Sequence, residues 1–116
     1  MLKREKKNAA LALLTAIVLV VVAVTGSTPL AAQDGPTLYK ARCAMCHGAD
    51  GKGETPMGKK LNIRDLSSPE VQKQTDAELT TIISKGKGKM PPFEGKLTAE
   101  QVGQVLAHIR ELGKKK

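Results

Sequence analysis

The pentapeptide Cys43-Ala44-Met45-Cys46-His47 holds both cysteines of the 116-residue chain. If this segment is helical, residues three and four positions apart share one face, so both thiols and the imidazole point toward one ligand. Two thiols suit the two vinyl groups of a porphyrin, and an imidazole suits its iron. The Cys-x-x-Cys-His spacing therefore predicts a haem c attached through Cys43 and Cys46, with His47 as the proximal iron ligand.

Two other chemistries use a Cys-x-x-Cys pair, namely thiol–disulfide exchange and zinc binding. A zinc site needs four ligands, and the only other histidine, His108, lies 61 residues after His47. A thioredoxin-like site expects strands that alternate with helices, and the sequence shows no such pattern. Haem attachment is therefore the favoured interpretation, with a thiol oxidoreductase as the alternative.

Residues 1–32 have the composition of a secretory signal. Four basic residues precede the uncharged run Ala9–Val24, and Ala31-Ala32 offers small residues for cleavage. The run of sixteen residues is shorter than the roughly 20 that span a bilayer. We therefore predict cleavage after Ala32, a periplasmic or otherwise extracytoplasmic location, and one mature domain over residues 33–116. An uncleaved membrane anchor is the alternative.

The predicted mature domain is small, basic and poor in aromatic residues. Its 84 residues contain one Tyr, one Phe and no Trp, and domains of this size often need a staple. A covalently held haem would supply the missing apolar surface. The first 32 residues hold four basic and one acidic side chain, so their removal lowers the net charge from +8 to +5. No basic patch with interleaved aromatics indicates nucleic acid, and the charge favours docking to an acidic protein or an anionic membrane face.

Capping boxes predict where three of the helices begin, and apolar residues on one face follow them. The boxes are Ser67–Glu70, Thr75–Glu78 and Thr98–Gln101. A further helix is expected to begin near Pro36 and to run into the haem motif. Residues 52–65 contain Pro56 and Gly58 and are predicted to form a loop. Because no segment alternates with period two, the domain is expected to be all-α, with three to four helices around one haem.

The iron of a haem held by one histidine either keeps an open position or binds a second residue. Met45 lies between the attached cysteines, Met57 follows the motif too closely to reach the opposite face, and His108 falls among apolar residues that suggest packing. Met90 lies in a glycine- and lysine-rich segment, and two prolines follow it directly and stiffen the loop. We therefore predict Met90 as the sixth ligand, with simple packing under the loop as the alternative.

With these motifs the chain resembles the small monohaem class I c-type cytochromes of bacteria. The matching segments are Gly35-x-x-x-Tyr39-x-x-x-Cys43, the haem motif through Gly48, Lys89–Phe93 and Val105–Arg110. The resemblance implies a class I cytochrome c fold, in which the closing helix crosses the first helix at Gly35 and Tyr39. Two departures stand out: the family often has an aromatic residue in place of His108, and no tryptophan is available to bond a haem propionate.

The resemblance also implies a soluble, monomeric one-electron carrier rather than an enzyme. It would shuttle electrons between a donor and an acceptor protein while His47 and Met90 both stay bound. Two further functions stay open: a haem c sensor or peroxidase-like protein with a labile Met90, and a membrane-anchored cytochrome subunit of a respiratory complex. Basic residues near the haem are candidates for a docking ring against acidic partners, with an ordinary solvated surface as the alternative. They are Lys40, Arg42, Lys85, Lys87 and Lys89.

Overall fold

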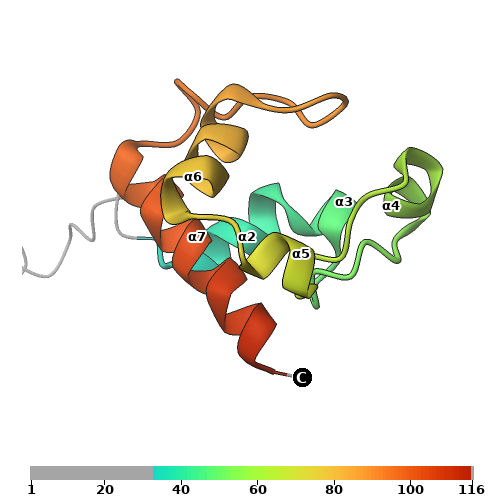
Figure 1. The fold of residues 1–116 in the computed structure, drawn as a ribbon. Coiled ribbons are helices and arrows are strands. Elements are labelled where there is room, and N and C mark those ends of the chain that lie inside the picture. Colours follow the sequence, from blue (N-terminus) through green and yellow to red (C-terminus); the bar gives the residue numbers. More distant parts are fainter. Residues whose placement is uncertain (1–32, 116) are drawn as a thin grey trace, which may run out of the picture. The chain divides into compact units, whose positions relative to one another are not determined.

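The structure, a computed structural model, describes residues 33–115, and in this range it contains six helices and no strand. They are α2 (Gly35–Arg42), α3 (Ala44–His47), α4 (Pro56–Leu61), α5 (Pro69–Gln72), α6 (Asp76–Lys85) and α7 (Ala99–Lys114) (Figure 1). The all-α prediction is therefore confirmed. The predicted signal segment lies outside the described residues. No helix within the described range is long and apolar enough to cross a membrane.

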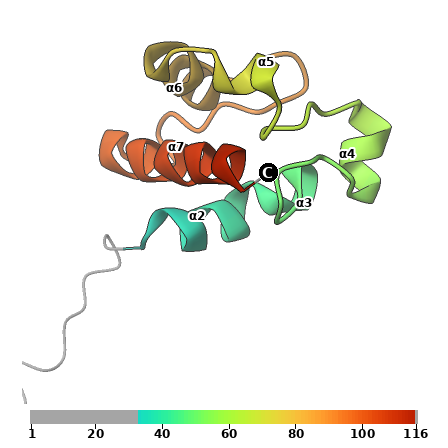
Figure 2. The same cartoon turned by 60° about the horizontal axis from the view of Figure 1, so that its bottom comes forward.

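Helix α7 is the central element of the domain. It contacts α2 on one side and α5 and α6 on the other, and Figure 2 shows it between these two layers. The apolar residues that follow the last capping box are all buried, as their helical spacing predicts. They are Val102, Val105, Leu106, Ile109 and Leu112. The core thus forms along the apolar face of one amphipathic helix.

The crossing of α2 and α7 depends on a residue without a side chain. Gly35 is buried at the start of α2, and a Cβ built there would overlap the backbone carbonyl of Gln104 in α7. One turn further along, the buried Tyr39 ring packs against the imidazole of His108, with 4.8 Å between the ring centroids. The two helices therefore approach closely at Gly35 and are separated beyond it by the tilted rings of Tyr39 and His108.

We expect Gly35→Ala to destabilise the protein by about 1–3 kcal/mol, because the added methyl group must push α2 away from α7. Gly103→Ala is the matched control, since Gly103 is exposed on α7 and a Cβ added there would meet nothing within 4 Å. That control should stabilise the helix by about 0.5–1 kcal/mol. Denaturant unfolding followed by circular dichroism measures both changes. Equal shifts in the two variants would show that the crossing does not constrain this glycine.

The capping boxes at Thr75 and Thr98 form as predicted, with reciprocal side-chain bonds in both. The capping box predicted at Ser67 is wrong by one residue. Ser68, not Ser67, is the N-cap of α5, and its hydroxyl accepts a hydrogen bond from the Val71 amide at 3.4 Å. The Ser67 hydroxyl instead donates to the Asp65 carboxylate at 2.6 Å, which commits it to the preceding turn.

The helix expected to run from Pro36 into the haem motif is interrupted at Cys43. This residue has φ −118° and ψ −35°, and it separates α2 from α3. Its amide still donates to the carbonyl of Tyr39 at 2.8 Å, so the hydrogen bonding passes through the junction. The break turns the short helix that carries the motif relative to α2.

The loop predicted over residues 52–65 contains α4. Thr55 caps it by accepting a hydrogen bond from the Gly58 amide at 2.9 Å, Pro56 occupies the first turn, and Asn62 ends it with a φ of 52°. Proline is tolerated in a first turn, and asparagine adopts the left-handed conformation more readily than most residues. The residues that suggested a loop therefore mark the two ends of a short helix.

Candidate functional site

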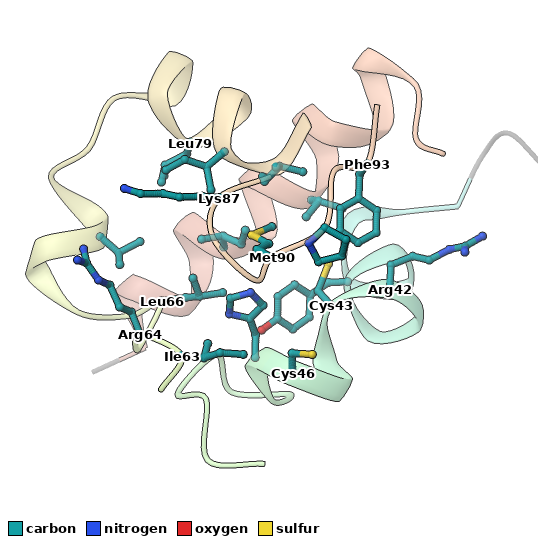
Figure 3. Close-up of a pocket in the computed structure, with 18 of the residues that line it drawn as sticks. Arg42, Cys43, Cys46, Ile63, Arg64, Leu66, Leu79, Lys87, Met90 and Phe93 are labelled. Carbon is teal, nitrogen blue, oxygen red and sulfur yellow. The ribbon is translucent and has the colours of Figure 1, made fainter. Parts of the chain in front are cut away.

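A cavity of about 350 Å³ opens within the helical core (Figure 3). Much of its wall consists of side chains that also belong to the core. These are Val71, Leu79, Ile83, Phe93, Val105 and Ile109. Pockets of a few hundred Å³ with apolar walls and a few polar groups are typical of cofactor sites.

All four residues predicted to hold the haem line this cavity: Cys43, Cys46, His47 and Met90. Figure 3 shows the thiols of Cys43 and Cys46 on the same side of the cavity. The other candidates for the sixth ligand lie elsewhere. The Met45 and Met57 side chains are 75 % and 39 % exposed, and neither they nor His108 belong to the cavity wall. The fold therefore brings together one histidine, one methionine and both thiols, from segments 43 residues apart.

The haem motif is held in place by hydrogen bonds that its backbone carbonyls accept from two sides. The Tyr39 hydroxyl donates to the carbonyl of Gly48 at 2.7 Å, and the Thr55 hydroxyl donates to that of Cys46 at 2.9 Å. The Gly53 amide donates to the carbonyl of His47 at 2.7 Å. Burial raises the pKa of Tyr39, so its hydroxyl stays protonated and remains a donor. The backbone that positions the histidine is thus fixed by both α2 and the segment before α4.

The imidazole of His47 is poised to act as a ligand. It is half-buried, and its Nδ1 atom is buried without a hydrogen-bond partner among the described residues. Burial lowers the pKa of His47, which favours the neutral ring with a lone pair free for a metal. An orphaned ring nitrogen in a core is costly unless a ligand or a metal orients the ring. This histidine therefore fits the iron of a haem.

The thiols fit covalent attachment better than redox exchange. Both are free and half-buried, and burial raises the pKa of Cys43 to about 11. Thiol–disulfide exchange depends on thiolates, which low-pKa cysteines in electropositive surroundings supply. The burial of Cys43 has the opposite effect, because it disfavours the thiolate. Among the described residues, no group of three or more His, Cys, Asp or Glu side chains is arranged to hold a metal ion.

Backbone contacts with α6 hold the Met90 loop on the cavity wall. Met90 and Lys87 exchange amide-to-carbonyl hydrogen bonds of 3.0 and 3.2 Å, which close a tight turn. Beyond it, the Phe93 amide donates to the carbonyl of Ile83 at 3.1 Å. Gly86 has a φ of 76°, and a Cβ there would meet the Met90 carbonyl at 2.5 Å, so glycine is required at this position. The thioether is therefore presented by a constrained loop, as the sequence predicts.

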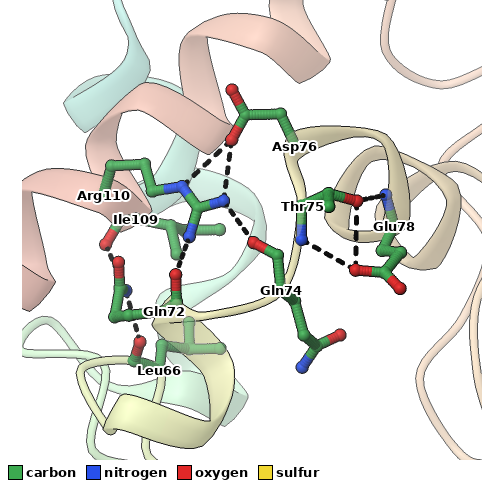
Figure 4. A network of polar contacts seen from close by, with 8 residues as sticks. All are labelled: Leu66, Gln72, Gln74, Thr75, Asp76, Glu78, Ile109 and Arg110. Carbon is green, nitrogen blue, oxygen red and sulfur yellow. Dashed lines mark hydrogen bonds and ion pairs between the residues drawn. The ribbon is translucent and has the colours of Figure 1, made fainter.

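A polar network joins α7 to the segment around α5 and the start of α6 (Figure 4). Arg110 of α7 donates to the carbonyls of Gln72 and Gln74 at 2.8 and 2.6 Å, and it pairs with Asp76 at 2.7 Å. The Gln72 amide group donates in turn to the carbonyls of Leu66 and Ile109 at 2.7 and 3.1 Å. Because Gln74 and Leu66 line the cavity, this network helps to set its shape.

Residues 61–66 form a part of the wall that the sequence did not predict. Ile63 and Leu66 are partly buried there, and Asn62 and Arg64 also line the cavity. This segment carries no motif, and all of it except Leu66 falls within the predicted loop. One feature of the sequence could have predicted that this segment lines a cavity. Leu61, Ile63 and Leu66 stand close together among polar residues, and an exposed loop does not need so many apolar side chains.

Comparisons with known proteins find similarity to cytochromes, in agreement with a haem site. The sequence model of a family described as cytochrome C oxidase, cbb3-type, subunit III matches residues 30–109. Cytochrome c6 of Microcystis aeruginosa is 34% identical over 76 residues, which cover 66% of this chain and 90% of that protein. The cbb3-type cytochrome c oxidase subunit FixP of Azorhizobium caulinodans is 32% identical over 78% of this chain but only 30% of its own length. Among solved structures, the KustC0563 c-type cytochrome superposes with a TM-score of 0.64 at 35% identity, and it covers 69% of this chain and 98% of that one.

Proposed function

The chain belongs to the small monohaem class I c-type cytochromes, and on this premise we propose that it carries single electrons between protein partners through a haem c ligated by His47 and Met90. The carrier function follows from the family. The ligation and the attachment points are our proposal. Bound haem supplies an iron that alternates between the ferric and the ferrous state. The chain attaches it through Cys43 and Cys46.

The observation that carries the proposal is the composition of the cavity wall. Two thiols, the orphaned imidazole of His47 and the thioether of Met90 meet around a largely apolar space. Histidine and methionine as axial ligands raise the reduction potential of a haem, and burial adds to this by disfavouring the extra ferric charge. The constrained loop would hold Met90 as a ligand in both redox states. These features support a carrier rather than an enzyme, because a carrier needs no open iron position.

Intact mass of the exported protein, with an absorption spectrum, tests this proposal. We expect a chain beginning at Gln33 whose mass exceeds that of the polypeptide by one haem, with neither cysteine available to alkylate. Thiols that alkylate in the folded protein, together with a mass without haem, would instead support the thiol oxidoreductase alternative. A chain beginning at Met1 with haem attached would support a membrane anchor and leave the haem assignment intact.

A respiratory-complex subunit is the second candidate function. The family model is described as an oxidase subunit, and the FixP relative carries that name. This candidate predicts that the protein co-purifies with a membrane complex. The carrier predicts a monomer that is released with the soluble extracytoplasmic fraction. Size-exclusion chromatography of both fractions, followed by absorbance of the haem, separates the two.

For the partners we propose donor and acceptor proteins with acidic docking surfaces. Lys85, Lys87 and Lys89 all lie on or beside the Met90 loop, and all three are exposed. Lys85 already pairs with Glu94 at 2.6 Å, which makes Lys89 a stronger candidate than Lys85. Such a surface increases the rate of association with a partner more than the affinity for it. Added salt should lower that association rate, because it screens the charges.

A further inference from the structure

Cationic side chains line the cavity without matching carboxylates. Among the described residues of the wall there is no Asp and no Glu. The cations are Arg42, Arg64, Lys87 and Lys89. Arg64 and Lys87 form no ion pair with any described residue. An excess of positive charge around an apolar space calls for an anion on the molecule that enters it.

Two of these cations lie together on the side of the cavity away from the cysteines. Figure 3 shows the charged ends of Arg64 and Lys87 on that side, across Met90 from Cys43 and Cys46. Arg42 lies next to Cys43 and points away from the cavity. The two cations come from separate segments, one after α4 and one after α6. Their convergence is therefore a product of the fold and not of sequence proximity.

The chemistry of the porphyrin assigns a role to this side. Its two vinyl groups occupy one edge of the ring, and its two propionates occupy the opposite edge. A haem attached through its vinyl edge to Cys43 and Cys46 would direct its carboxylates away from the cysteines, to the side on which Arg64 and Lys87 lie. We propose that these two side chains are the counter-ions of the haem propionates and that they raise the reduction potential of the iron. The proposal rests on the proposed function. It names partners for the haem propionates, for which the sequence offers no tryptophan.

The polar neighbours of the two cations suit this role. Asn62 and Gln74 also line the cavity, and their amide groups can donate to carboxylates. Lys87 and Gln74 further line an adjacent hollow that contains Glu78. The Glu78 carboxylate accepts hydrogen bonds from the amide and hydroxyl of Thr75, at 2.7 and 3.0 Å, within its capping box. It is therefore engaged at the helix start, and it forms no ion pair with Lys87.

The test is a potentiometric titration of purified holoprotein variants. Arg64→Gln and Lys87→Gln each remove one positive charge beside the propionates, which stabilises the ferric state. We expect the equilibrium constant for reduction to fall about three- to tenfold in each, or roughly 30 to 60 mV. Arg64→Lys should restore most of the loss, since it restores the charge. Lys73→Gln is the matched control, because Lys73 is exposed just after α5 and does not line the cavity, and it should shift the constant less than twofold.

Resonance Raman spectra supply a second readout, because the propionate bending bands report hydrogen bonding at the carboxylates. We expect these bands to shift in Arg64→Gln and in Lys87→Gln but not in Lys73→Gln. Unshifted bands, or equal changes in potential for all three variants, would overturn the proposal. If Arg64→Gln does not accumulate, Lys87→Gln alone decides the question. A wild-type protein without covalent haem would refute the proposed function first, so the two failures are distinguishable.

Discussion

Met90→Ala is expected to abolish the long-wavelength iron–sulfur charge-transfer band of the ferric protein and to open the sixth position to added ligands. The reason is that no other candidate side chain lines the cavity opposite the haem motif within the described residues. Loss of the thioether also removes its preference for the ferrous iron. We expect the equilibrium constant for reduction to fall at least about a hundredfold, or roughly 120 mV. Absorption spectroscopy and redox potentiometry of the purified variant measure both effects.

Two other methionines supply matched controls for this variant. Met45→Ala and Met57→Ala make the same chemical change at exposed positions outside the cavity wall. Both should keep the charge-transfer band and the wild-type potential. If the band survives in Met90→Ala and disappears in one of the controls, the ligand assignment is wrong. If no variant and no wild-type protein shows the band, the sensor or peroxidase-like alternative is favoured over the carrier.

The double variant Cys43→Ala/Cys46→Ala is expected to lose covalent haem and most of its folded structure. Without attachment the haem is held only by His47, Met90 and apolar contacts. The core that remains contains one tyrosine and one phenylalanine around a cavity of about 350 Å³. A cavity of this size in a small domain removes much of the stabilisation that burial supplies. We expect cooperative thermal unfolding in the wild type and none in the double variant.

Intact mass under denaturing conditions gives the direct readout for the cysteines. Each single variant should keep one thioether and therefore the added mass of one haem, with lowered yield. The double variant should have the mass of the polypeptide alone. Met45→Ala lies inside the same pentapeptide and should keep the full haem mass. A double variant that retains haem after denaturation would show that the attachment does not run through these thiols.

Long, periodic segments were predictable from the sequence. The apolar spacing of α7 follows one face of a helix, and its five predicted core residues are all buried. The boxes at Thr75 and Thr98 fix helix starts because both partners of each box lie within four residues. Met90 is marked by its prolines and glycines, which are local features as well. Signals of this kind need no knowledge of the rest of the fold.

Features that depend on distant contacts could not be predicted in the same way. Helix α4 is short, and the residues that start and end it are also typical of loops. The assignment of Ser68 rather than Ser67 as a cap depends on Asp65, which engages the earlier hydroxyl. Arg64 lies on the cavity wall because α4 places it there, and nothing near it in the sequence marks a binding residue. The cation pair is visible only once the fold brings Lys87 to the same side.

A spectroelectrochemical titration of the wild-type holoprotein tests the central claim most directly. The claim is that one covalent haem, ligated by His47 and Met90, exchanges one electron. We expect a single one-electron Nernst curve along which the iron–sulfur charge-transfer band appears on oxidation and disappears on reduction. A ferric spectrum without that band, or with the signature of a five-coordinate iron, would contradict the claim.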